Sequence, residues 1–386
     1  MSCHARTMCL LAFLGMFFVS SRSSRLPAEE VSPSDFFNLA YRTQRVERDK
    51  IRTWKGTIHC REKTSVADPP QDIVEKVPSW QRVFREMKFD SSFLVDASRS
   101  RLFSTLQPIA KINFLDAEGR VLAHSDERGY NSRTLITDRT FTLRPWQAPG
   151  RQKGDPSVPG WKASKSRVIE ESSRRNAASR AVVGDILDPL RLFDPPGDDF
   201  IGYLQLLSEA TDATYFRGLN LRQEKSPEGD VFVWGSGEPR ARFEAEYLVG
   251  KHVGFHLLSY RLYDRNQGIL VCKVDVTYTR VANVIVPSKY EMQKMSEDGS
   301  HLQVGRSYEL SDQVLNQPLD EQVFSMKHLG ARPGDRVIDQ QAAALRLVNG
   351  DFNIVPVADF EKEYSNGFED HSAEANDPIG PLEKKR

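Results

Sequence analysis

The stretch Ile269-Leu-Val-Cys-Lys-Val-Asp-Val-Thr-Tyr-Thr279 decides the fold class of this chain. Apolar side chains occupy every second position, and polar side chains fill the positions between them. The apolar set is Leu270, Cys272, Val274, Val276 and Tyr278. A period of two residues is typical of a β-strand with one face in a core and the other near water. The stretch therefore predicts a half-buried strand.

Similar alternating stretches continue on both sides of it, joined by short turns. Residues 93–96 and 101–104 flank one turn, residues 112–115 and 121–124 flank a second, and residues 134–137 and 140–146 flank a third. Consecutive hairpins of this kind form an antiparallel meander. Amphipathic patterns predict one helix at 33–48 and another at 198–209. We therefore expect an α+β, mainly β fold: a large curved antiparallel sheet, shaped like a half-barrel, covered by a few helices.

The pattern divides the 386 residues into five parts. Residues 1–21 are expected to be a signal peptide, and residues 30–146 a helix with a first antiparallel meander. Residues 147–185 are rich in Pro, Gly, Ser and Arg, which predicts a linker or insertion with a short helix near 167–180. Residues 186–350 are expected to hold a helix and a second meander that completes the same sheet. Residues 359–386 are acidic and poor in large apolar residues, which predicts a disordered tail.

The N-terminus indicates export. Arg6 precedes an apolar run over residues 9–19, and small residues follow, with cleavage expected after Ser21 or Ala28. A basic start, a short apolar stretch and small residues are typical of a secretory signal peptide. The run is too short to cross a bilayer, so we expect a periplasmic or secreted protein.

The charge composition excludes several classes. Lys plus Arg and Asp plus Glu both total 53, so the formal net charge is zero. A nucleic-acid-binding protein usually carries a basic excess, so we expect no nucleic-acid partner. The sequence contains no phosphate-binding loop, no dinucleotide-binding motif and no serine-hydrolase elbow. It therefore predicts no catalytic residue, no cofactor and no metal ligand set. A catalytic pair of carboxylates, as in glycoside hydrolases, remains an open alternative, because such residues can be far apart in the sequence and meet only in the folded chain.

Aromatic residues on the expected strands are the candidate binding residues. Trp54, Trp234, Phe243, Tyr247 and Tyr278 lie at alternate strand positions. Such residues either form an ordinary sheet core or line an apolar cavity enclosed by a curved sheet.

Two cysteines remain after removal of the signal peptide. Cys60 and Cys272 both lie at apolar positions of expected strands. In an exported protein they could form one disulfide, and two buried free thiols are the alternative.

The order of these features resembles that of the periplasmic lipoprotein-carrier superfamily (LolA/LolB-like proteins). The shared features are an export signal, a leading helix, a long meander with a Trp54-x-Gly56 first strand, a mid-sequence helix and no catalytic motif. Residues 324–339 also resemble the end of uncharacterised secreted proteins of planctomycete-type bacteria.

The first resemblance implies a half-barrel capped by helices. Because the sequence contains no catalytic motif, this resemblance favours an exported, monomeric, non-enzymatic carrier or binding protein. A lipid, an acylated partner or a lipoprotein would occupy the concave face, with contact to a membrane surface. An exported hydrolase with a carboxylate site and a cell-envelope structural or interaction protein are the alternatives.

Overall fold

A computed structural model describes residues 32–69, 71–77, 81–106, 112–125, 132–137, 139–145, 167–173, 189–196, 199–210, 216, 218–236, 241–339 and 344–364. The expected signal peptide lies outside these residues. The helices are α1 (Pro33–Asp49), α2 (Gln71–Val74), α4 (Phe200–Glu209), α5 (Met326–Leu329) and α6 (Val357–Tyr364). Short 3₁₀ helices are η1 (Ala97–Arg99), η2 (Pro189–Phe193), η4 (Lys251–Val253) and η5 (Glu321–Phe324).

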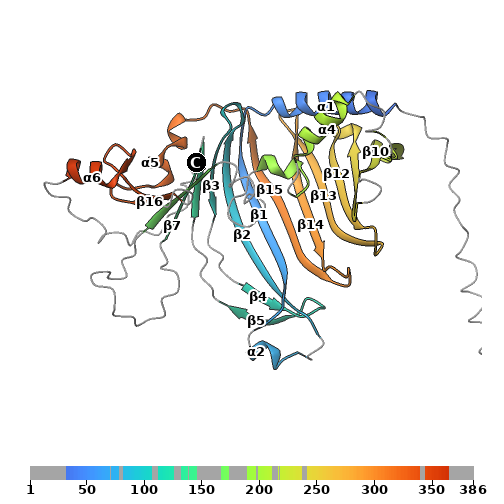
Figure 1. The fold of residues 1–386 in the computed structure, drawn as a ribbon, viewed down its shortest axis with the longest axis horizontal. Coiled ribbons are helices and arrows are strands. Elements are labelled where there is room, and N and C mark those ends of the chain that lie inside the picture. Colours follow the sequence, from blue (N-terminus) through green and yellow to red (C-terminus); the bar gives the residue numbers. More distant parts are fainter. Residues whose placement is uncertain are drawn as a thin grey trace, which may run out of the picture.

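Within the described residues, eighteen strands form one connected sheet. Figure 1 shows how they are arranged. They are β1 (Thr53–Val66), β2 (Val83–Asp96), β3 (Arg101–Leu106), β4 (Ile112–Leu115), β5 (Val121–Ser125), β6 (Ser132–Ile136), β7 (Arg139–Pro145), β8 (Arg167–Ser173), β9 (Arg222–Ser226), β10 (Gly229–Ser236), β11 (Phe243–Gly250), β12 (His256–Asp264), β13 (Ile269–Val281), β14 (Val284–Met295), β15 (Leu302–Leu315), β16 (Arg336–Asp339), β17 (Ala344–Val348) and β18 (Ile354–Pro356).

Strand β1 joins the two halves of the sheet. Strands β9 to β15 pair with their sequence neighbours, and β15 then pairs antiparallel with β1. On its other edge β1 pairs along its whole length with β2. The sheet curves without closing into a barrel, and helices cover part of it. The expected fold class is confirmed.

The sheet forks at β2. The second half of β2, from Ser91 to Asp96, pairs with β3, whereas Phe84–Met87 pairs with β4 of the β4–β5 hairpin. From β3 the sheet continues through β6, β7 and β8 to β16, β17 and β18. The β8–β16 pair is the parallel one among the described pairings.

Alternation along the strands builds two cores on opposite faces. On β3, Leu102 belongs to the larger core and Phe103 to the smaller one. Ile136 and Leu135 of β6 divide in the same way. The larger core lies beneath α1, η2 and α4, on what we call the inner face. The smaller core lies on the opposite, outer face, beneath η5 and α5. Successive strand residues point to opposite faces, so each strand can contribute to both cores.

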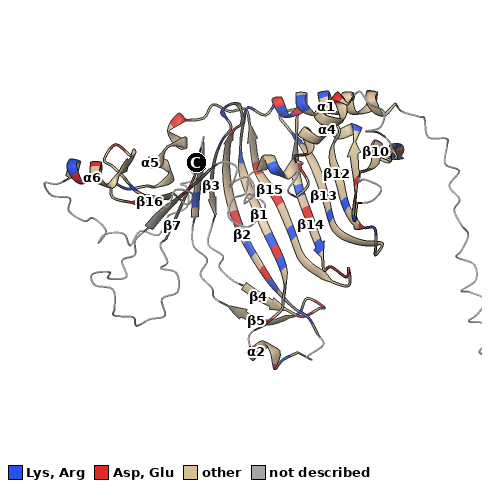
Figure 2. Cartoon of the chain, viewed as in Figure 1, with Lys and Arg blue, Asp and Glu red and all other residues tan. Residues whose placement is uncertain are grey.

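Strands β1 and β2 carry charged residues of both signs (Figure 2). On the outer face, Arg61 of β1 donates to Glu86 of β2 at 2.6 Å. Glu62, the next residue of β1, lies on the opposite face, where it accepts from Arg306 of β15 at 2.9 Å. Cross-strand pairs of opposite charge stabilise a sheet by a few tenths of a kcal/mol to about 1 kcal/mol each.

Two local expectations are wrong. Arg167–Ser173 forms β8, whereas a short helix was expected to begin there; pairing with β7 and β16 on both edges overrides the local preference. The rest of the expected 147–185 insertion lies outside the described residues. At the C-terminus, residues 359–364 of the expected disordered tail belong to α6, where Phe360 is buried. Residues 365–386 lie outside the described part.

Candidate functional site

Helix α1 covers the inner face with one stripe of side chains. Phe36, Ala40 and Gln44 are buried at intervals of four residues, and Phe37 is buried beside them. Residues four apart lie on the same face of a helix, so this stripe faces the sheet. Helix α4 packs against α1, and Asp199 caps it by accepting the Gly202 N–H at 3.1 Å.

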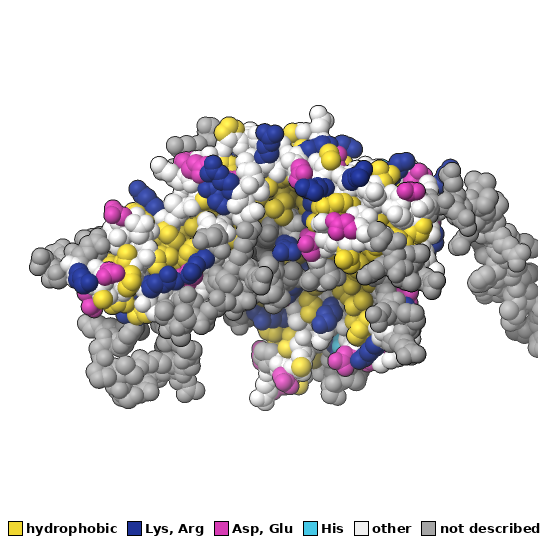
Figure 3. Space-filling view, turned by 45° about the horizontal axis from the view of Figure 1, so that its top comes forward, with side chains coloured by type: hydrophobic (Ala, Val, Ile, Leu, Met, Phe, Trp, Pro, Cys, Tyr) yellow, Lys and Arg dark blue, Asp and Glu magenta, His cyan; other side chains and the backbone are white. Residues whose placement is uncertain are grey.

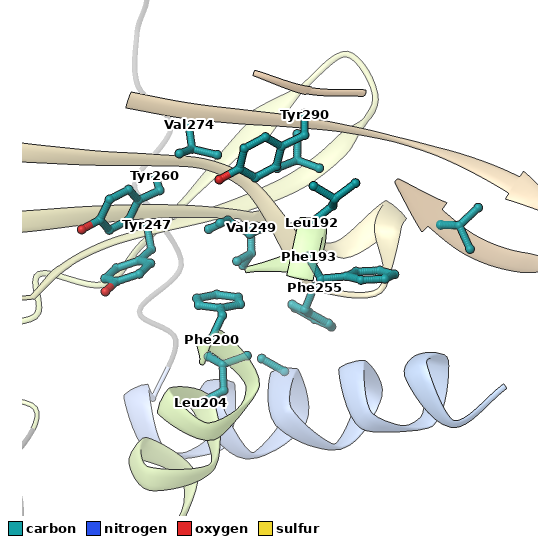
Figure 4. Packing of buried hydrophobic residues seen from close by; sticks show 14 of the residues in the cluster. Leu192, Phe193, Phe200, Leu204, Tyr247, Val249, Phe255, Tyr260, Val274 and Tyr290 are labelled. Atoms are coloured by element: carbon teal, nitrogen blue, oxygen red, sulfur yellow. The ribbon is translucent and has the colours of Figure 1, made fainter. Parts of the chain in front are cut away.

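An aromatic cluster forms where the two helices meet the sheet (Figure 4). Trp234 of β10 and Tyr247 of β11 are cross-strand partners, and their rings stack at 5.4 Å. Phe200 of α4 stacks on Tyr247 at 5.6 Å, and Phe37 of α1 meets the Trp234 ring edge-to-face at 5.4 Å. Both helices therefore contact the sheet through aromatic rings, which contribute large buried areas and favourable ring geometry.

A buried polar group lies beside this cluster. Arg48, one turn beyond Gln44 on α1, donates to Asp194 at 2.6 Å, and the two side chains are 17 % and 5 % exposed. The Arg48 guanidinium also lies 5.0 Å from the Phe193 ring centre. Burial raises the pKa of Asp194 above its ordinary value, and the neighbouring Arg48 opposes this effect. The ion pair fastens the end of α1 to the segment that follows η2.

His256 is the most deeply buried titratable group in the same region. Its ring packs 4.8 Å from Phe193 and stacks on Tyr278 at 5.4 Å. Burial, and then the nearby Arg48 charge, lower the pKa of His256 well below its ordinary value. The ring is therefore neutral at physiological pH.

Several polar atoms under the helices have no hydrogen-bond partner among the described residues. They are both ring nitrogens of His256, the indole nitrogens of Trp54 and Trp234, and the side-chain oxygen of Gln44. A buried polar atom without a partner costs about 1–3 kcal/mol. The contact between the helices and the sheet is thus mainly apolar, and it leaves several buried polar atoms without a hydrogen bond.

Four of the five predicted binding residues lie at this contact. Trp54 and Trp234 are fully buried and Tyr247 is 6 % exposed. Tyr278 packs against the same core, and its hydroxyl donates to the Leu257 carbonyl at 2.9 Å. Phe243 lies apart from them: it is 42 % exposed at the start of β11, 5.1 Å from the Arg242 guanidinium.

Sequence reasoning missed the polar residues of the site. Gln44 and Arg48 extend the apolar stripe of α1 at the same spacing, and this was the available signal. Asp194 is the first residue of a Pro- and Gly-containing acidic segment, and its partner Arg48 is 146 residues away. No local pattern could connect them.

Comparisons with known proteins identify no family. No protein-family model matches the sequence, and no characterised protein sequence matches it. Among solved structures, the chain is similar to a DUF1329 family protein from Desulfovibrio piger, with 10 % identity and a TM-score of 0.33. That likeness covers 78 % of this chain and 100 % of the other.

It is also similar to a putative outer membrane lipoprotein-sorting protein domain from Vibrio parahaemolyticus, with 12 % identity and a TM-score of 0.31. Here 75 % of this chain and 97 % of the other are covered. Likenesses at this level establish neither a family nor an activity.

Of the two alternatives for the cysteines, a disulfide or two free thiols, the structure has the free thiols. Cys60 and Cys272 are both free, Cys60 buried and Cys272 half-buried. Their strands, β1 and β13, are separated in the sheet by β15 and β14. Adjacent strands lie about 4.8 Å apart, so the two cysteines are farther apart than the about 5.5–6 Å between Cα atoms that a disulfide prefers.

Within the described residues, no group of three or more His, Cys, Asp or Glu side chains is arranged to hold a metal ion. In the same part of the chain, no helix has the length and apolarity that crossing a membrane requires.

Proposed function

We propose that this chain is an exported binding protein that carries a lipid or another acylated ligand between the inner face of its sheet and helices α1 and α4. The observation that carries the proposal is the set of partnerless polar atoms beneath those helices. Trp54, Trp234 and His256 place four such atoms in an otherwise aromatic core. Apolar walls with a few convergent polar groups are typical of small-molecule sites.

A ligand would displace side chains of the helices from the inner face of the sheet. An acyl chain would take the place of rings such as Phe36 and Phe37 against Trp234, so the apolar area buried would change little. An ester carbonyl on the ligand would accept from the indole N–H groups that have no partner in the closed arrangement. Each new hydrogen bond would remove part of the desolvation penalty, which favours exchange.

The outer surface of the two helices supports contact with a membrane. Leu39 and Val46 of α1 are 53 % and 57 % exposed, and Leu206 of α4 is 59 % exposed. Arg42 and Arg45 are exposed on the same helix. In Figure 3, hydrophobic side chains stand among charged side chains of both signs around the helices that cross the sheet. A surface of this type suits the boundary between lipid headgroups and acyl chains.

The test is a measurement of where an acyl chain lies. Trp80, Trp146 and Trp161 are replaced by Phe, so that emission comes from Trp54 and Trp234. We expect a bromine-labelled fatty acid to quench this emission in a saturable way, and native mass spectrometry of protein from its own envelope to detect bound lipid.

Unlabelled fatty acid of the same length is the ligand control, because it should bind without quenching. Phe243→Ala is the protein control, since that ring lies outside the covered core and its loss should leave quenching unchanged. Binding without quenching would place the ligand elsewhere, and no binding with a lipid-free mass would reject the proposal.

A further inference from the structure

Three strands bring a serine, a histidine and an aspartate into one hydrogen-bonded row on the outer face. Ser311 lies on β15, His59 on β1 and Asp90 on β2, and β1 pairs with both of the other strands. His59 Nε2 is 2.8 Å from Ser311 Oγ, and His59 Nδ1 is 2.8 Å from Asp90 Oδ1. His59 alternates with the buried Ile58 and Cys60, so the row faces away from the helices.

The partners fix the proton positions in the neutral imidazole. An ionised carboxylate only accepts, so Asp90 requires the proton on Nδ1. Nε2 is then an acceptor, and Ser311 is the hydroxyl within reach. Ser311 Oγ also lies within donating distance of Asp312 Oδ2, at 3.2 Å, so this carboxylate competes with Nε2 for the single hydroxyl proton. The shorter contact, 2.8 Å to Nε2, is the one through which the proton would pass to His59. This is the arrangement in which an imidazole removes a proton from a serine.

An apolar cavity of about 320 Å³ opens beside the row. Leu94, Phe103 and Val323 supply apolar walls, and its polar lining consists of Lys55, Thr57, Ser92, Asp312 and His328. Thr57 and Ser92 are cross-strand partners two residues from the His59–Asp90 pair, a step of about 7 Å on the same face. Asp312 follows Ser311 directly. The volume and lining suit a small apolar group.

A β-bulge sets the backbone next to Ser311. Lys55 pairs with Val314 and Thr57 with Ser311, so two β15 residues stand opposite Gly56. One of them, Asp312, has a φ of 52°. A Cβ on Gly56 would lie 3.0 Å from the Ser311 carbonyl oxygen, so a larger residue here would push the two backbones apart. A bulge leaves backbone groups outside the ladder, where an amide can serve a developing oxyanion.

We propose that Ser311, His59 and Asp90 form a hydrolytic site for carboxylic esters whose acyl group occupies this cavity. Ser311 Oγ bonds to the ester carbonyl carbon as its proton passes to His59 Nε2. The ester C–O bond then breaks, and the departing alcohol takes that proton. Water, giving a proton to His59, attacks the acyl-serine and releases the acid, and the proton returns to Ser311. Asp90 orients the imidazole and stabilises its charged form.

This site is independent of the proposed carrier function, because it lies on the opposite face of the sheet. The test uses the whole protein with p-nitrophenyl butyrate and with a fluorophosphonate probe, which bonds to an activated serine with loss of fluoride. We expect ester turnover above the buffer rate, and mass spectrometry of the labelled protein to find the probe on Ser311.

Ser311→Ala and His59→Gln should each lower the turnover by about 10²–10⁴-fold, and Asp90→Asn should lower it as well. Ser307→Ala is the matched control: it changes a serine of the same strand and should leave the rate unchanged. Circular dichroism checks that each variant folds. The probe result on the unaltered chain does not depend on any variant, and labelling spread over other serines would overturn the proposal. Equal turnover in Ser311→Ala and the unaltered chain would overturn it as well.

Discussion

Removing the arginine of the buried Arg48–Asp194 pair is expected to destabilise the fold strongly. Arg48→Met keeps most of the side-chain length but removes the charge that faces a carboxylate only 5 % exposed. Breaking a buried ion pair on one side costs about 3–5 kcal/mol, because the remaining charge is desolvated without compensation. That is a large part of the free energy of unfolding of a typical domain, which is about 5–15 kcal/mol.

The pH dependence follows from the direction of the pKa shift. Burial raises the native pKa of Asp194 above its ordinary 3.8, with Arg48 and Arg191 opposing the rise and Asp199 adding to it. The native state therefore binds more protons than the unfolded state between these two pKa values, and stability falls as the pH rises through that window. Without Arg48 the native pKa rises further, so the loss should be largest near about pH 7 and shrink towards about pH 4.

Chemical denaturation of the variant and the unaltered chain at both pH values measures this difference. Adding Asp194→Asn to Arg48→Met should recover much of the stability at neutral pH, since no buried charge is left. A loss below about 1 kcal/mol for Arg48→Met, or an equal loss at both pH values, would refute the reasoning.

Three further outcomes are expected. Asp96→Asn should lower stability by about 1–3 kcal/mol at neutral pH. Burial opposes ionisation of Asp96, but hydrogen bonds, including one of 2.6 Å from Arg101, lower its pKa; the difference from the unaltered chain should therefore vanish as the pH falls through that pKa. Thiol counting on denatured, unreduced protein that begins at Arg22 should find Cys60 and Cys272 as two free thiols. Alkylation of the native protein should be slow, because burial raises the pKa of Cys272 to about 11 and that of Cys60 further; one bridged pair or fast labelling would contradict this. Trp234→Ala should reduce the unfolding free energy by about 3–5 kcal/mol, and a loss under 1 kcal/mol would show that its packing matters little.

Local patterns predicted much of the architecture. The hairpins β2–β3, β4–β5 and β6–β7 were predicted, because the turns and the period of two residues are properties of contiguous sequence. Helix α1 was predicted for the same reason, from its spacing of apolar residues. Four of the five aromatic residues selected from strand parity do lie in the large core, since parity decides the face of a strand.

Tertiary structure alone decided which strands that are far apart in the sequence meet. The β1–β15 contact joins residues more than 240 positions apart, and the sequence carries no local signal for that pairing or its register. The same contact keeps Cys60 from Cys272 by inserting β15 and β14 between their strands. It also brings Ser311 to His59 across 252 positions, just as the folding of α1 onto η2 brings Arg48 to Asp194. Side-chain contacts of this kind depend on which distant strands pair and in which register. Alternation and helix capping depend only on neighbouring residues, and these local patterns are what a sequence by itself reveals.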